Sequence, residues 1–134
     1  MRLGVLAVIA AAAVIAGGAA CSVDPFREGT FAATHVVRDG SEVRIAGDDG
    51  LELSFEDSGV VVTIGCNSIG GTYEIRGETL IITDVISTAM GCPAAIARQE
   101  EWLADFLDSD PGWDLEDSTL TLTSDDSIIT FEKQ

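Results

Sequence analysis

The sequence contains few of the residues that most often carry out chemistry. Its 134 residues include one histidine, His35, and three cysteines. No GxSxG, P-loop or HExxH motif is present, so it lacks the short patterns that place a catalytic serine, a phosphate or a zinc ion. Structural zinc sites use four cysteine or histidine ligands. Because Cys21 is assigned to a lipid below, two cysteines and one histidine remain, and we expect neither a metal centre nor another cofactor. His35 alternates with Thr34 and Val36, which predicts a surface or half-buried strand position.

Basic residues are also scarce. Seven lysines and arginines stand against 23 aspartates and glutamates, for a formal charge of −16. A surface this acidic repels nucleic acid phosphates and anionic lipid headgroups. We therefore expect no nucleic-acid partner, and any attachment to a membrane would have to come from a lipid. A saline habitat or simple solubility would account for the same acidity.

The acidic residues form no recognisable calcium loop. In an EF-hand loop counted from Asp108, glycine would stand at Trp113 and glutamate at Thr119. We interpret the segment from Asp108 to Asp117 as a solvated helix end followed by a turn, with calcium binding as the alternative. A pair of carboxylates for glycoside hydrolysis cannot be singled out in so acidic a chain.

The only long apolar run lies at the N-terminus. A basic start, Met1-Arg2, precedes the uncharged stretch LGVLAVIAAAAVIAGGAA, and this order is typical of a secretory signal. We predict that residues 1–20 are a signal peptide. A transmembrane anchor is the alternative, because about 18 apolar residues can span a bilayer, but no basic stop-transfer cluster follows.

The run ends in GAAC, from Gly18 to Cys21, which resembles a bacterial lipobox. Gly18 stands where such motifs more often have leucine, valine or isoleucine. Cys21 is also the odd one of three cysteines. We predict that Cys21 is lipidated, that residues 21–29 form a short tether, and that the protein is extracytoplasmic and anchored to the cell membrane.

From residue 30 onward, apolar and polar residues mostly alternate, as half-buried strands require. Helical spacing occurs only between residues 93 and 107. We predict a β-rich (α+β) domain over residues 30–134. It is a compact antiparallel sheet or partly open barrel of about seven to eight strands, with one helix packed on it. The expected strands cover 30–37, 42–46, 51–57, 59–66, a hairpin over 70–85, and 113–133 with bends near 116–117 and 124–126.

Cys66 and Cys92 remain after Cys21 is assigned. Two cysteines in an exported chain usually pair, and a bond here would join a strand end to the start of the helix. Closing a loop of about 27 residues would stabilise the fold by roughly 3–4 kcal/mol. Two free buried thiols are one alternative. A reactive thiol is another, because a helix N-terminus lowers a thiol pKa.

Several short motifs follow one another along the chain. They are, in order, Gly65-Cys66-Asn67, Gly70-Gly71-Thr72-Tyr73, Gly77 and Thr88-Ala89-Met90-Gly91-Cys92-Pro93. This ordered set resembles the META domain, also called the HslJ-like domain. The matching pattern covers most of the chain, from about Gly29 to Lys133, with Phe31 where the family often has tryptophan. The resemblance implies a compact β-rich fold, a lipoprotein context and an envelope location, and it brings no agreed enzymatic activity or cofactor.

A structural role accounts for the presence of each motif residue discussed next. Glycine at 65, 70 and 71 permits a positive φ or a close approach, and Asn67 can bond nearby backbone in the turn. Met90 is expected to fill a gap under the helix. Pro93 is tolerated at a helix start. Contact with a ligand by Asn67, Tyr73 or Thr88 is the alternative.

Together these features predict a non-catalytic lipoprotein domain of the cell envelope. It would act as a binding or stress-related maintenance module, with an unknown envelope protein or small ligand as partner and the membrane reached through the N-terminal lipid. One alternative is a small extracytoplasmic enzyme that uses a thiol or a carboxylate. Another is a protein-inhibitor module whose acidic surface suits a basic partner.

Overall fold

The structure, a computed structural model, describes residues 24–46 and 50–134. The predicted signal peptide, residues 1–20, and the predicted lipidation site, Cys21, lie outside the described residues and stay predictions. Within the described ranges, no helix has the length and apolar character needed to cross a membrane.

Nine strands and one helix make up the described part of the chain, with the helix between the sixth and seventh strands. The helix occupies the segment predicted from helical spacing. It begins after Pro93, which is its N-cap residue with φ −52° and ψ 143°. The elements are β1 (Thr30–Arg38), β2 (Ser41–Val43), β3 (Leu51–Glu56), β4 (Gly59–Ile64), β5 (Asn67–Arg76), β6 (Thr79–Ser87), α1 (Ala94–Asp108), β7 (Gly112–Glu116), β8 (Thr119–Ser124) and β9 (Ser127–Lys133).

Eight of the strands form a closed antiparallel barrel. The order β1-β3-β4-β5-β6-β7-β8-β9 is closed by pairing of β1 with β9, from Phe31 opposite Lys133 to Val37 opposite Ile128. The remaining strand, β2, lies outside the barrel order and pairs with the end of β1 that extends past β3. The predicted β-rich fold with one packed helix is confirmed, and the barrel is closed because the first and last strands meet.

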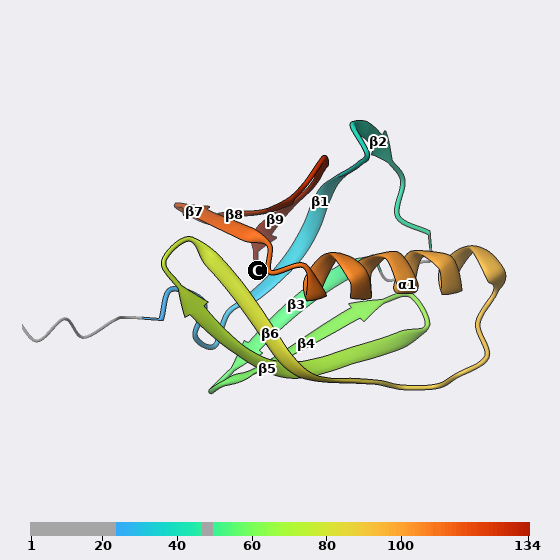
Figure 1. The fold of residues 1–134 in the computed structure, drawn as a ribbon, viewed down its shortest axis with the longest axis horizontal. Coiled ribbons are helices and arrows are strands. Elements are labelled where there is room, and N and C mark those ends of the chain that lie inside the picture. Colours follow the sequence, from blue (N-terminus) through green and yellow to red (C-terminus); the bar gives the residue numbers. More distant parts are fainter. Residues whose placement is uncertain (1–23, 47–49) are drawn as a thin grey trace, which may run out of the picture.

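The weakest part of the barrel wall is the pairing of β6 with β7. These strands share one residue pair, Thr79 with Gly112. Two backbone bonds flank this pair: the Leu80 N–H donates to the Pro111 carbonyl at 2.9 Å, and the Trp113 N–H donates to the Glu78 carbonyl at 2.8 Å. Beyond this point the strands separate, and α1, which connects them in sequence, lies across the opening (Figure 1).

Every second side chain of a strand points into the barrel and fills it, because successive residues of a strand point to opposite faces. Leu51, Leu53 and Phe55 of β3 are buried, whereas Val61 of β4 lies outside and is 46% exposed. In β9 Ile129 is buried, and adjacent Ile128 lies on the outer face and is 38% exposed. The other strand residues in this core are Phe31, Val36, Val60, Val62, Ile64, Ile69, Tyr73, Leu80, Ile82, Leu120, Leu122 and Phe131.

The two ends of the barrel are closed by different segments. At one end, α1 buries Leu103, Phe106 and Leu107, which recur at helical spacing. At the other end, the turn from Asp24 to Gly29 inserts Phe26, which is fully buried and stacks on Phe55 at 4.9 Å between ring centroids.

This packed turn differs from the expected tether over residues 21–29. Phe26 also meets Phe31 and Trp113 edge to face, and burying an aromatic ring of this size outweighs the freedom of a short linker. The folded unit therefore includes Asp24, and the stretch from Asp24 to Gln134 contains the barrel, both closures and the helix. We treat it as a self-contained folding unit.

Several hairpin turns place an aspartate in the left-handed backbone region. Asp39, Asp57, Asp117 and Asp125 have φ between 48° and 53°. Aspartate tolerates this region better than most residues because its short carboxylate can bond local backbone. Part of the acidic composition therefore follows from the turns that a small antiparallel barrel needs.

Candidate functional site

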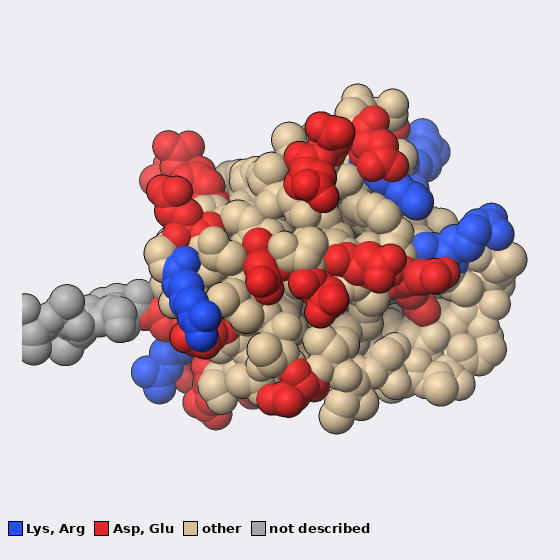
Figure 2. Space-filling view, viewed as in Figure 1, with Lys and Arg blue, Asp and Glu red and all other residues tan. Residues whose placement is uncertain are grey.

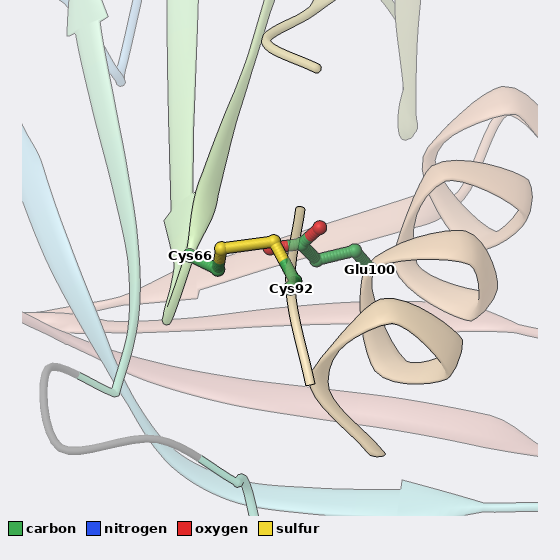
Figure 3. Close-up of side chains that lie close together, drawn as sticks. All are labelled: Cys66, Cys92 and Glu100. Carbon is green, nitrogen blue, oxygen red and sulfur yellow. A yellow bond between two sulfur atoms is a disulfide. The ribbon is translucent and has the colours of Figure 1, made fainter. Parts of the chain in front are cut away.

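Two parts of the motif, residues 65–67 and 88–93, meet where α1 joins the barrel, around a disulfide between Cys66 and Cys92 (Figure 3). Cys66 lies in the turn between β4 and β5, and Cys92 lies two residues before α1. The S–S distance is 2.05 Å, so the predicted pairing is present in the structure. A disulfide sulfur carries no thiolate, and the reactive-thiol alternative has no nucleophile while this bond is formed.

Asn67, the first residue of β5, is the centre of a buried hydrogen-bond network. Its backbone N–H and its side-chain Nδ2 donate to the two carboxylate oxygens of Glu100, at 2.6 and 2.9 Å. Its Oδ1 accepts from the Thr88 hydroxyl at 2.9 Å and from the Met90 N–H at 2.8 Å. Asn67 thus ties both the helix and the segment before it to the barrel. The expected local turn bonds are replaced by bonds to distant residues.

The segment from Thr88 to Met90 is held by its polar groups and not by burial. The Thr88 hydroxyl also accepts from the Ser68 N–H at 3.0 Å. The prediction for Met90 was wrong, because its side chain is 63% exposed and fills no gap beneath α1. The physical reason is that the Met90 backbone bonds Asn67, which leaves its side chain turned to solvent.

The motif glycines serve different purposes. Gly65 has φ +81°, which L side chains rarely adopt. At Gly71 an added Cβ would lie 2.9 Å from both Ile82 Cγ2 and the Thr83 carbonyl oxygen, so a close approach of β6 requires glycine there. Glycine was also predicted to be required at position 70, but there an added Cβ would meet nothing closer than 4.0 Å.

Glu100 brings a carboxylate close to the disulfide. Its oxygen and the two sulfurs of Cys66 and Cys92 lie within 4.8 Å of one another, and Glu100 extends from α1 toward the disulfide (Figure 3). Metal binding would need thiolates in place of the disulfide, and both Glu100 oxygens are already bonded by Asn67. This arrangement fixes α1 and offers no chemistry of its own.

Tyr73 lies at the opposite end of the barrel from the disulfide. Its hydroxyl donates to the Asp24 carboxylate, and it bonds the Asp57 carbonyl at 3.1 Å. Burial raises the pKa of Tyr73, and the hydrogen bond with Asp24 raises this pKa further. The role of Tyr73 is to fasten the N-terminal turn, because Asp24 also accepts from the Phe26 N–H.

A cleft lies beside α1, between the helix and the segment that runs from β2 to Ala46. Its volume is about 250 Å³. Arg38, Arg44 and Arg98 line it, and these are three of the seven basic residues in the chain. Figure 2 shows basic side chains in the region of β2 and the first turns of α1, with acidic side chains close to them and elsewhere on this face.

The walls of this cleft are held by specific contacts. Gln99 bonds the backbone of Ala46 twice, accepting from its N–H at 2.7 Å and donating to its carbonyl at 3.1 Å. These bonds draw the chain after β2 toward α1, so β2 ends at Val43 and is shorter than the predicted strand over 42–46. The Arg38 guanidinium lies over the Trp102 ring, 5.4 Å from its centre.

Sequence reasoning did not find the cleft. Its arginines stand at positions 38, 44 and 98 in different elements, and no periodic pattern relates them. Other predicted positions were placed as expected: His35 is exposed on β1. Within residues 108–117, all of which the structure describes, the acidic side chains do not gather as metal ligands.

The protein is therefore a small β-rich domain: a closed eight-stranded barrel with one helix held across an end by a disulfide. Residues 24–134 match the META domain family, and the chain belongs to this family. No match was found among curated proteins.

Solved structures share the fold. A protein from Burkholderia xenovorans, solved by NMR, has a TM-score of 0.69 at 17% identity, over 81% of this chain and 83% of that one. A second NMR structure has a TM-score of 0.62 at 19% identity, over 78% and 88%. The crystal structure of a DUF4847 family protein from Bacteroides vulgatus has 0.58 at 15%, over 81% and 94%.

Proposed function

We propose that this META domain is a non-catalytic binding module of the cell envelope, held at the extracytoplasmic face of the membrane by a lipid on Cys21. The observation that carries the proposal is the state of the motif residues. Cys66 and Cys92 are bonded to each other, and Asn67 is bonded to Glu100. Groups that an enzyme would need free are used to hold a helix beside an open cleft.

The anchor would set the orientation of the domain. Three residue steps separate Cys21 from Asp24, and an extended chain spans at most about 3.6 Å per residue. A lipid on Cys21 would therefore keep the Asp24 end of the barrel within roughly 11 Å of the bilayer. The first turns of α1 lie at the far end (Figure 1), so the cleft would face away from the membrane.

Fractionation of cells tests the anchor. We expect the full chain in the membrane fraction, with a mature mass that includes acyl groups on Cys21. The Cys21→Ser variant should leave that fraction, and a Cys66→Ser/Cys92→Ser variant serves as the control because it removes cysteines without removing the lipid site. Equal distribution of the wild type and Cys21→Ser would contradict the proposal.

Alkylation tests the absence of thiol chemistry. In the soluble chain from Ser22 to Gln134, folded without reductant, Cys66 and Cys92 are the only cysteines. We expect no added alkyl group by intact mass under denaturing conditions until reductant is supplied. Addition of two alkyl groups without reductant would show that both thiols are free and would support the alternative of a thiol enzyme.

A further inference from the structure

We propose that the cleft between α1 and the segment from β2 to Ala46 binds a small anion that carries an apolar group, such as a short-chain carboxylate. The inference rests on the binding role proposed above and gives it a location and a ligand class. Three features of the cleft carry it: the charge at its rim, the apolar surface beneath, and the fixed position of its walls.

The rim is basic in a protein that is otherwise acidic. Arg38, Arg44 and Arg98 all line the cleft, and a guanidinium presents a fork of N–H donors that matches a carboxylate. Among the residues that the structure describes, the one carboxylate within 4.0 Å of the Arg38 guanidinium is that of Asp39, at 3.9 Å. Among the described residues, no carboxylate lies within 4.0 Å of Arg44 or Arg98.

The inner surface of the cleft is apolar. Leu51 and Ile64, which also line it, are 3% and 1% exposed and belong to the barrel core. The half-buried ring of Trp102 forms one side. A volume of about 250 Å³ holds roughly eight non-hydrogen atoms, since a water molecule takes about 30 Å³ in the liquid. The space therefore suits a short hydrocarbon chain below a single charged group.

The cleft is built before any ligand arrives. The Gln99–Ala46 bonds fix one wall, and the disulfide together with the Asn67–Glu100 bonds fixes the helix. A pocket with fixed walls loses little conformational freedom on binding. The overall negative charge opposes the approach of large polyanions, so the cleft selects a small ligand of low charge.

Fluorescence of Trp102 gives a direct test. The chain has two tryptophans, and Trp113→Phe in the soluble Ser22–Gln134 protein leaves Trp102 as the only one. This replacement removes a buried indole N–H that has no hydrogen-bond partner, so it should be well tolerated. The probes are hexanoate and hexan-1-ol, which share an apolar chain and differ in charge.

We expect hexanoate to change the Trp102 emission with saturation, and hexan-1-ol to bind at least about tenfold more weakly, because hexan-1-ol lacks the negative charge that strengthens a hydrogen bond from a guanidinium. Arg44→Gln/Arg98→Gln should weaken hexanoate binding by about tenfold or more. The matched control is Arg27→Gln/Arg76→Gln, which removes the same charge from exposed arginines outside the cleft and should leave binding unchanged.

Three results would overturn the inference in different ways. Equal binding of both probes, unaffected by Arg44→Gln/Arg98→Gln, would keep the cleft as a binding site but reject the anion. No saturable change with either probe would reject the cleft itself. An equal loss in the control pair would show that net charge, and not the cleft, governs binding. The fractionation and alkylation results stand apart from all three, so a failure here is distinguishable from a failure of the proposed function.

Discussion

At the scale of single residues, Asn67 and Glu100 have the most specific arrangement in the domain. Both are buried, at 8% and 9% exposure, and each Glu100 oxygen accepts one N–H of Asn67. A buried carboxylate loses its hydration and needs such donors in return. The pair therefore specifies the position of α1 against β5 through geometry that few other residue pairs would satisfy.

Exchanging the two side-chain types across this pair tests the geometry. Asn67→Asp places oxygen against oxygen, and Glu100→Gln places an amide against an amide, so each single variant should lose about 2–4 kcal/mol of unfolding free energy. The double variant Asn67→Asp/Glu100→Gln restores a donor opposite an acceptor and should recover more than half of the loss. Urea unfolding measures all four proteins, and additive losses would show that the two side chains are not coupled.

Tyr73 links stability to alkaline pH. Its folded pKa is raised by burial and by Asp24, so its contribution is complete below its unfolded pKa of about 10 and is lost as pH rises above that value. We expect Tyr73→Phe to cost about 1–3 kcal/mol at pH 7 and to flatten the loss of stability above pH 10. Because the chain has one tyrosine, phenolate absorbance follows this group alone, and ordinary titration near pH 10 in the folded protein would contradict the assignment.

At the scale of elements, two short segments complete what the strands begin. The helix covers the end of the barrel where β6 and β7 separate, and the turn from Asp24 to Gly29 covers the other end. Neither is a strand, yet both bury side chains that the barrel leaves uncovered. A small barrel exposes core at its two open ends, and these caps supply the missing apolar contacts.

Phe26 provides the test of the N-terminal cap. Phe26→Ala removes a fully buried ring and should lower the unfolding free energy by about 3–5 kcal/mol. Phe26→Leu keeps most of the apolar volume and should lose less than half as much. Denaturant midpoints at constant m-value measure both variants. An alanine variant as stable as the wild type would mean that residues 24–29 act as a tether after all.

At the scale of the whole molecule, the charge distribution is uneven. The chain from Ser22 to Gln134 keeps all 23 acidic residues and six of the seven basic ones, and half of those six line one cleft. Two stretches, residues 59–73 and 85–97, contain no charged side chain at all. The remaining surface carries an excess of negative charge that repels itself in the folded state.

Salt should therefore stabilise the domain. Raising NaCl from about 0.01 to 1 M shortens the screening length from about 30 Å to 3 Å, and each 1 kcal/mol gained should raise the Tm by about 4 °C. We expect a clear rise at pH 7 and a much smaller one near pH 4, where many carboxylates are protonated. A salt response that is equal at both pH values would show that charge repulsion does not limit stability.

Patterns in the sequence were enough to predict the inward face of a strand, the position of the helix and the disulfide. Alternation in β3 predicted which of its side chains face inward, and helical spacing after Pro93 predicted α1. The pairing of Cys66 with Cys92 was predicted from the number of cysteines together with the prediction that the chain is exported, and the structure contains this bond. These inferences held because each depends on neighbours in the chain or on composition.

The contacts between segments far apart in the chain could be read from the three-dimensional structure alone. Closure of the barrel joins Phe31 to Lys133, Phe26 leaves the expected tether to fill an end of the core, and Met90 turns outward because its backbone is held by Asn67. The arginines of the cleft converge for the same reason. Their contacts span tens of residues, and a local pattern carries no information about which remote partners the closed sheet will bring together.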